Sequence, residues 1–203
     1  MKMILPLLFT IFLITNSAFA FPNEPDGFRS LKWGDSVDKF KTEYKDVNFE
    51  RNATATELFS KKQQTYAVYT AKLGNRKLSN IDLQKYGCFL FKDDKLIGVL
   101  LRSKEYKSVS DFKKNQSDFL ENLTILYSKY NRDFNRYEPN LSKKVERYIW
   151  DDSDKSVIMV DSVTDFKIDG INYIEVSIFD INYFYKVMTS TFDQKDNAKE
   201  QGW

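Results

Sequence analysis

Carboxylates, lysines and tyrosines must carry any acid–base chemistry of this chain, because its 203 residues include no histidine and only one cysteine. The missing histidine excludes Ser-His-Asp and Cys-His nucleophile systems as well as histidine-ligated zinc. A hydrolase would have to use two converging carboxylates, and Asp151 and Asp180 are one such pair. For cleavage of a glycosidic bond, these groups would have to lie about 5–9.5 Å apart. The sequence therefore favours binding over catalysis and predicts no cofactor.

One acidic segment begins like a calcium-binding loop but does not continue as one. Residues 152–156 have the sequence Asp-Ser-Asp-Lys-Ser. An EF-hand loop needs glycine at its sixth position and glutamate at its twelfth, where this chain has Val157 and Val163. We therefore expect a polar hairpin turn and no metal site. Cys88 has no partner for an intramolecular disulfide, and its apolar surroundings predict a small buried hydrophobic residue.

Aromatic residues are abundant, with 17 Phe, 12 Tyr and 3 Trp in the chain. Tyr173 and the segment 183–185 are able to form a surface on which sugars stack, because an aromatic face suits apolar sugar C–H groups. The high strand propensity of tyrosine and phenylalanine favours the alternative that they fill the core of a sheet. We select Trp33, Tyr183 and Tyr185 as possible contacts with a partner or ligand. For Trp33 a packing role is favoured, because the alternation of residues places it beside Leu31 on the apolar side of a strand.

The charged residues do not indicate a nucleic-acid partner. The formal net charge is +2, and the charges of both signs are interspersed. A nucleic-acid-binding protein would be expected to show a basic stripe. Segments such as 143–147 (Lys-Lys-Val-Glu-Arg) are therefore expected to be solvated faces.

The first twenty residues have the layout of a secretory signal peptide. Lys2 precedes an apolar run from Met3 to Ile14, and Ala18-Phe19-Ala20 matches a cleavage site. We expect cleavage between Ala20 and Phe21, which would place the mature protein in the periplasm or outside the cell. The run is shorter than the roughly 20 apolar residues of a membrane span, so no stable span is expected after cleavage.

The pattern of apolar residues predicts short elements in the first part of the mature chain. A strand is expected over 27–32, followed by a turn at Trp33-Gly34 and a short helix that Asp35 or Ser36 caps. Two strands are expected near 47–49 and 66–70. Two apolar segments then surround Lys92-Asp93-Asp94-Lys95, which indicates a hairpin. Gly98 is expected at a bulge or at a close approach of another element.

The second part contains the clearest helical periodicity, from about 109 to 130. Its apolar residues recur at helical spacing, Ser108 or Ser110 can cap it, and Leu123 is expected to face the core. Strands are then expected over 145–150, 156–162, 163–168 and 171–180, with Asp169-Gly170 as a hairpin turn. A final helix is expected over 181–192.

These elements predict an α+β fold, with an antiparallel sheet of hairpins packed against one long helix (about 109–130) and a short N-terminal helix. We expect a signal peptide (1–20), a single domain (21–192) and a flexible C-terminal tail (193–203). The two halves each contain a helix and later a hairpin with a charged turn. This likeness fits a duplication, and it also fits ordinary hairpin chemistry.

The segment 28–37 (Phe-Arg-Ser-Leu-Lys-Trp-Gly-Asp-Ser-Val) resembles the F-R-x-L/I-x-W-G-x-S opening of small exported bacterial proteins of unassigned function. The resemblance implies an exported bacterial domain and supplies no catalytic residues. Together, these observations predict an exported binding or envelope-interaction module. An aromatic-lined small-ligand or glycan-binding protein and a carboxylate-based hydrolase are the alternatives. The partner is thus an unknown envelope protein or a small ligand.

Overall fold

The computed structural model describes residues 25–54, 65–130, 132–138, 142–151, 154–166 and 170–184. The expected signal peptide, its cleavage site at Ala20 and Phe21, and the expected tail lie outside these residues. Within them, no helix has the length and hydropathy that a membrane crossing requires.

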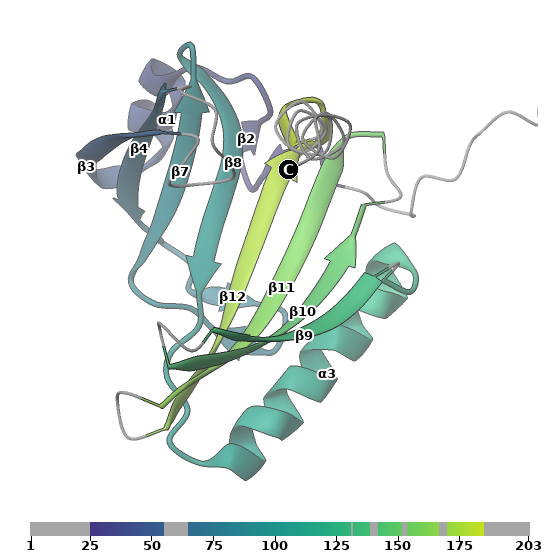
Figure 1. Cartoon of the computed structure of the whole chain (residues 1–203). Coiled ribbons are helices and arrows are strands. Elements are labelled where there is room, and N and C mark those ends of the chain that lie inside the picture. Colours follow the sequence, from purple (N-terminus) through teal and green to yellow (C-terminus); the bar gives the residue numbers. More distant parts are fainter. Residues whose placement is uncertain are drawn as a thin grey trace, which may run out of the picture.

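One antiparallel sheet of eight strands dominates the molecule, in the spatial order β3-β4-β7-β8-β12-β11-β10-β9. The sheet is twisted, with β3 and β9 as its two edge strands (Figure 1). Its strands are β3 (Lys45–Thr54), β4 (Thr65–Lys72), β7 (Tyr86–Lys92), β8 (Lys95–Arg102), β9 (Arg132–Glu138), β10 (Lys143–Trp150), β11 (Ser156–Asp165) and β12 (Ile171–Asp180).

Two small hairpins lie outside this sheet. One pairs β1 (Gly27–Phe28) with β2 (Leu31–Lys32), and the other pairs β5 (Lys77–Leu78) with β6 (Ile81–Asp82). The single strand expected over 27–32 is therefore wrong. Arg29 adopts a φ of 59°, which turns the chain back on itself between the two short strands.

The short helix α1 (Val37–Glu43) begins as its sequence predicts. The Ser36 side chain accepts a hydrogen bond from the Lys39 amide and caps the first turn. Gly34, just before it, has a φ of 85°, a left-handed conformation that is costly for residues with a Cβ. Asp35 instead accepts a bond from the Lys32 amide and fixes the approach to the helix.

The second helix, α3 (Val109–Tyr127), is capped by Ser108 and is shorter than expected. It stops because Ser128 takes a φ of 66°. The Ser128 carbonyl then accepts a hydrogen bond of 2.8 Å from the indole of Trp150, which is fully buried. The burial of Leu123, predicted from the periodicity, is confirmed.

Both helices pack on the same face of the sheet. Phe40 of α1 and Phe119 of α3 belong to one continuous apolar core, together with strand residues such as Phe89, Val99 and Ile174. Figure 1 shows α1 against the part of the sheet formed by β3 to β8, and α3 against the part formed by β9 to β12. The opposite face, which neither α1 nor α3 covers, is called the open face below.

Gly98 occupies a close contact inside the sheet. A Cβ at this position would lie 2.4 Å from the ring of Phe179, so only glycine fits without rearrangement. The β7–β8 register also shifts between Leu90 and Phe91, which marks an irregularity beside Gly98. The prediction made for this glycine is confirmed.

The predicted α+β class, an antiparallel sheet of hairpins packed against one long helix and a short N-terminal helix, is wrong. The molecule is mainly β, and the continuous antiparallel sheet is its framework. Two features caused the error. The strand β9 (Arg132–Glu138) is rich in charged residues and shows no clear apolar alternation, and the pairing of β8 with β12 joins residues too distant in sequence for any local pattern to indicate.

The two halves of the sheet have the same order of elements. Within the described residues, α1 precedes β3, β4, β7 and β8, and α3 precedes β9, β10, β11 and β12. The last strand of each half, β8 or β12, meets the other antiparallel at the centre. A two-fold axis perpendicular to the sheet would produce this strand order with both helices on one face.

Candidate functional site

The residues of the open face follow from the alternation of side chains along each strand. Val99 and Leu101 of β8 point into the core under the helices, so Leu100 and Arg102 point to the open face. On β12, Ile174 and Val176 belong to the core, which places Glu175 and Ser177 on the open face. The same alternation selects the odd-numbered residues of β10 and β11.

Four charged side chains form a row across the middle of this face. The strand registers pair Arg102 with Glu175, Glu175 with Asp161, and Asp161 with Arg147. We call these four residues the charge ladder. Because directly paired residues point to the same side of a sheet, the ladder spans β8, β12, β11 and β10. It thus includes one strand from the first half and three from the second.

At one end of the charge ladder, Arg147 and Asp161 form a hydrogen-bonded ion pair. The Arg147 Nε donates to Asp161 Oδ1 at 2.5 Å, and its terminal nitrogen donates to Asp161 Oδ2. The two side chains are only 22% and 15% exposed. A bidentate pair of this kind fixes both side chains more firmly than a single contact does.

Glu175 lies between the two ends of the ladder. Burial raises the pKa of its carboxyl group, the charge of Arg102 lowers it, and the neighbouring charge of Asp161 raises it. Burial and the like charge outweigh the arginine, so the pKa of Glu175 lies above its ordinary value.

Arg102 forms the other end of the ladder. Its guanidinium carbon lies 3.5 Å from the centre of the buried Tyr173 ring. Its Nε atom is buried and has no hydrogen-bond acceptor among the described residues. Lys143 donates to the Tyr173 hydroxyl at 3.1 Å, and this hydrogen bond raises the pKa of Lys143. Lys143 also lies 3.5 Å from the carboxylate of Asp165.

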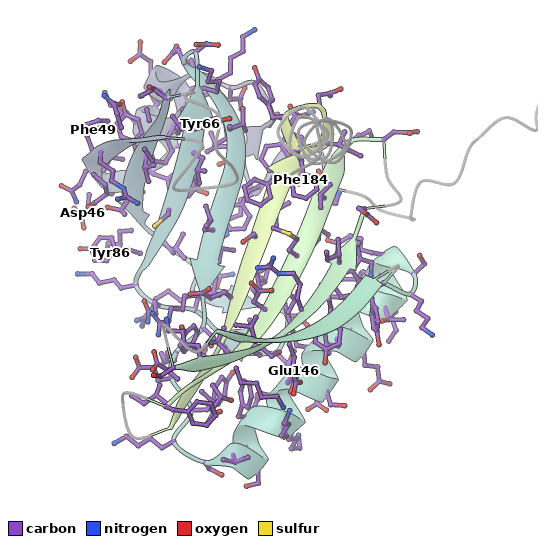
Figure 2. All side chains as sticks on the ribbon, in the orientation of Figure 1. Asp46, Phe49, Tyr66, Tyr86, Glu146 and Phe184 are labelled. Atoms are coloured by element: carbon purple, nitrogen blue, oxygen red, sulfur yellow. The ribbon has the colours of Figure 1, made fainter. Side chains whose placement is uncertain are left out.

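Apolar residues border the ladder toward the C-terminal end of β12. The buried side chains of Tyr66, Leu90, Ile97 and Phe179 cluster there, and Leu100 and Met159 pack against them. A helical turn follows β12, and its Phe184 stacks on Phe179 with ring centres 5.9 Å apart. Figure 2 shows Phe184 at this end of the sheet, over the end of β12.

Trp33 connects the N-terminal turn to β11. It is partly buried against the main core, and its indole Nε1 donates to Ser156 Oγ at 2.7 Å. The Ser156 hydroxyl in turn donates to the carbonyl of Pro25. Trp33 also lines a depression of about 290 Å³ whose other lining residues are Asp26, Lys32, Asp154, Lys155, Asp180 and Asn182. It thus joins the N-terminal turn to β11 in the other half of the sheet.

The remaining sequence-predicted positions do not converge with Trp33 into one site. Tyr183 is half-buried and packs against the apolar cluster at the end of β12, whereas Tyr185, Ala20 and Phe21 lie outside the described residues. Asp180 accepts bonds from the amide and side chain of Asn182, 2.9 and 3.2 Å long, so it caps the helical turn.

For the carboxylate alternative, Asp151 is buried just beyond the end of β10 and is absent from the lining of the depression that includes Asp180. Among the described residues, no three acidic or cysteine side chains gather as a metal site would require. Cys88 is half-buried on the open face of β7, and burial raises the pKa of its thiol. Cys88 was expected to be fully buried, and it is only half-buried.

Sequence reasoning missed the charge ladder. It treated the segment that contains Glu146 and Arg147 as a solvated face, but both side chains are only about one-fifth exposed and they point to opposite faces of β10. A usable signal was present in a charged residue within an apolar strand, as Asp161 is in Val157-Ile158-Met159-Val160-Asp161. Charged residues inside apolar strands indicate a position where a polar group is kept for a reason other than solubility.

Comparisons with known proteins add no assignment: no family model matches the chain, and neither curated proteins nor solved structures provide a significant match.

Proposed function

We propose that this chain is an exported binding protein that contacts a protein of the cell envelope through the open face of its sheet. The observation that carries the proposal is the charge ladder: four half-buried charged side chains, contributed by strands of both halves. The segment 1–20, with its signal-peptide layout, supports the location.

The ladder has the properties of a preorganised polar contact surface. Arg147 and Asp161 are already ordered by two hydrogen bonds and are largely removed from water. A partner that covers them loses less side-chain entropy and less hydration than it would on flexible, exposed charges. The two arginines at the ends and the two carboxylates between them also require a complementary pattern, which supports specificity.

Arg102 supplies a further argument. Its Nε is buried within the chain, but the side chain as a whole is 35% exposed, so a partner would meet the rest of the guanidinium group. Arginines in such partly buried positions are frequent hot spots of protein interfaces.

The apolar border gives the surface its second component. Leu100 and Met159 lie beside the ladder, and Tyr86 on the neighbouring strand β7 is 39% exposed. A polar centre with apolar and aromatic neighbours suits a folded protein partner, because such interfaces combine both kinds of contact.

The test uses a swap of charges, because removal of one member of the Arg147–Asp161 pair would leave a half-buried charge alone. The double variant Arg147→Asp/Asp161→Arg keeps one charge of each sign and reverses their positions. The control Lys114→Asp/Asp118→Lys reverses an exposed pair on α3, whose charged atoms are 2.9 Å apart. Each tagged mature protein is used to capture partners from envelope extract of the native host.

We expect the wild type and the α3 control to capture the same partner, and the ladder variant to retain less than about one tenth of it. This corresponds to the loss of about 1.4 kcal/mol or more of binding free energy. Circular dichroism and a urea titration establish that the ladder variant is folded. Equal capture by the ladder variant and the wild type would contradict the proposal, as would a specific loss in the α3 control.

A further inference from the structure

A pocket that shares no residue with the charge ladder lies where α1 ends and β3 begins. Its volume is about 460 Å³, within the range of roughly 300–1,000 Å³ that is typical of small-molecule sites. It is lined by Arg29, Ser30, Glu43, Tyr44, Lys45, Lys72, Gly74 and Asn75. We call it the α1 pocket.

The position of Arg29 at the rim is fixed by its surroundings. Its backbone has a φ of 59° in the turn between β1 and β2, an uncommon conformation for a residue other than glycine. Its guanidinium donates to the carbonyl of Asn75 and lies 4.9 Å from the centre of the Phe28 ring. The side chain is therefore held against the pocket by a hydrogen bond and a cation–π contact.

The charges around the α1 pocket are mainly positive. Arg29, Lys45 and Lys72 contribute three cations, and Glu43 is the one carboxylate among the lining residues. Asp46 lies 3.5 Å from the Lys72 ammonium, but both side chains are about half exposed, so this ion pair is weak. The excess of cations favours an anionic ligand.

Tyr44 lines the pocket and carries a buried hydroxyl. The residue is 8% exposed, and its buried hydroxyl has no acceptor for its proton within the described residues, while the Arg29 guanidinium lies near enough to act on its oxygen. The ring is held by Phe40 and Phe89, whose centres lie 5.4 and 4.8 Å from its own. Burial raises the pKa of Tyr44, and the charge of nearby Arg29 offsets part of this rise, so the hydroxyl keeps its proton at neutral pH.

We propose that the α1 pocket binds a small organic anion, with its acidic group at Arg29 and the Tyr44 hydroxyl. This site goes beyond the contact on the open face, and it shares no residue with the charge ladder. The ligand class follows from three features together: the size of the pocket, its excess of cations and the buried donor without an acceptor.

The probe for this proposal is 2-naphthoate, with neutral 2-naphthalenemethanol as its matched analogue. Isothermal titration at low salt is carried out with the wild type, Tyr44→Phe, Arg29→Gln and the control Lys114→Gln, which removes an exposed cation from α3. We expect saturable binding of one naphthoate per chain and at least about tenfold weaker binding of the alcohol. Tyr44→Phe and Arg29→Gln should each weaken naphthoate about five- to tenfold, as expected for hydrogen bonds to a charged group, whereas Lys114→Gln should not.

Tyr44→Phe separates a binding role from a packing defect, because it removes only the hydroxyl and keeps the ring. Loss of an unsatisfied buried hydroxyl should leave the urea midpoint unchanged or raise it. Weaker naphthoate binding at an unchanged or higher midpoint supports the proposal. Absence of saturable naphthoate binding by the wild type, equal affinity for the alcohol, or unchanged binding by Tyr44→Phe would overturn it.

Discussion

Arg147 and Asp161 differ from most ion pairs of the described residues in their burial. Pairs such as Lys114–Asp118 and Lys77–Asp82 are largely exposed, and exposed pairs typically contribute about 0–1 kcal/mol to stability. The ladder pair is bidentate and mostly buried, so either member alone would be costly. In a chain without histidine, such half-buried carboxylates and arginines are the groups that can respond to a partner.

Glu146, on the other face of β10, leads to a prediction about acid stability. Burial alone would raise its pKa, but bonds from Gln116, Lys144 and Lys113 lower it to about 2. Figure 2 shows Glu146 between β10 and α3, and these three donors lie 3.0–3.2 Å from it. Because the pKa in the folded state lies below the ordinary value of 4.5, the stabilisation is complete above about pH 4.5 and is lost as the pH falls toward 2.

Glu146→Gln should therefore be less stable than the wild type at pH 7, and its stability should fall less between pH 5 and pH 2. Urea midpoints measured across this range provide the comparison. Glu121→Gln, which removes an exposed carboxylate from α3, should keep the pH dependence of the wild type. Identical slopes for all three proteins would show that the Glu146 network does not contribute.

Trp33 gives a second prediction at this scale, about the connection between the N-terminal turn and β11. Trp33→Phe removes the indole donor to Ser156 and should cost about 1–2 kcal/mol, whereas Trp33→Ala should cost about 3–5 kcal/mol because the ring is lost as well. The double variant Trp33→Phe/Ser156→Ala should lose less stability than the two single variants lose in total, because both single changes remove the same hydrogen bond. If Trp33→Ala kept full stability but lost the envelope partner, Trp33 would be a binding residue instead.

Among the elements, hairpins and helix caps were the features that the sequence predicted best. Asp93 and Asp94 form the turn between β7 and β8 with φ values of 50° and 61°, a conformation that aspartate tolerates. Ser36 and Ser108 cap the two helices. These features depend on neighbours in the sequence, and local residue chemistry is enough to indicate them.

Elements that depend on distant partners were not predictable in the same way. The position of Arg102 beside Glu175 becomes evident only when β8 pairs with β12, and Gly27 and Phe28 form a strand only because Leu31 and Lys32 fold back on them. The α1 pocket was missed for the same reason, because Arg29, Tyr44 and Lys72 come from three separate elements.

The helix α3 supplies a prediction with an internal control. Leu123 is 6% exposed and faces the core, whereas Ile125 two residues later is 71% exposed. Leu123→Ala should therefore cost about 2–5 kcal/mol through lost burial and a residual cavity, and Ile125→Ala should change stability by less than about 0.5 kcal/mol. Urea denaturation of both variants measures the difference. A larger loss for Ile125→Ala would mean that the helix presents its other face to the sheet.

For the whole molecule, the pairing of β8 with β12 joins the two halves into one sheet. Each half contributes a helix and four strands in the same order, and one apolar core runs beneath both. The sequence did not decide whether the two halves are a repeat, because they share an order of helices and strands but little residue pattern. The structure shows that shared order directly.

The shared core predicts cooperative unfolding. A urea titration followed by far-UV circular dichroism and by tryptophan fluorescence should give one coincident transition, as a two-state domain does. Amide protons of β7 in the first half and β11 in the second should exchange with similar free energies of opening. Two separate transitions would show that the halves fold independently and that the β8–β12 pairing contributes little.

The most direct test of the open face as the contact surface is site-specific photo-crosslinking in intact cells of the native host. Ser177, partly exposed on the open face and two residues from Glu175, is replaced by benzoylphenylalanine, and exposed Ser117 of α3 serves as the matched control. We predict an ultraviolet-dependent adduct of one discrete mass from position 177 and none from position 117. The charge swap Arg147→Asp/Asp161→Arg should abolish that adduct. An adduct from position 117 with none from position 177 would contradict the assignment of the open face.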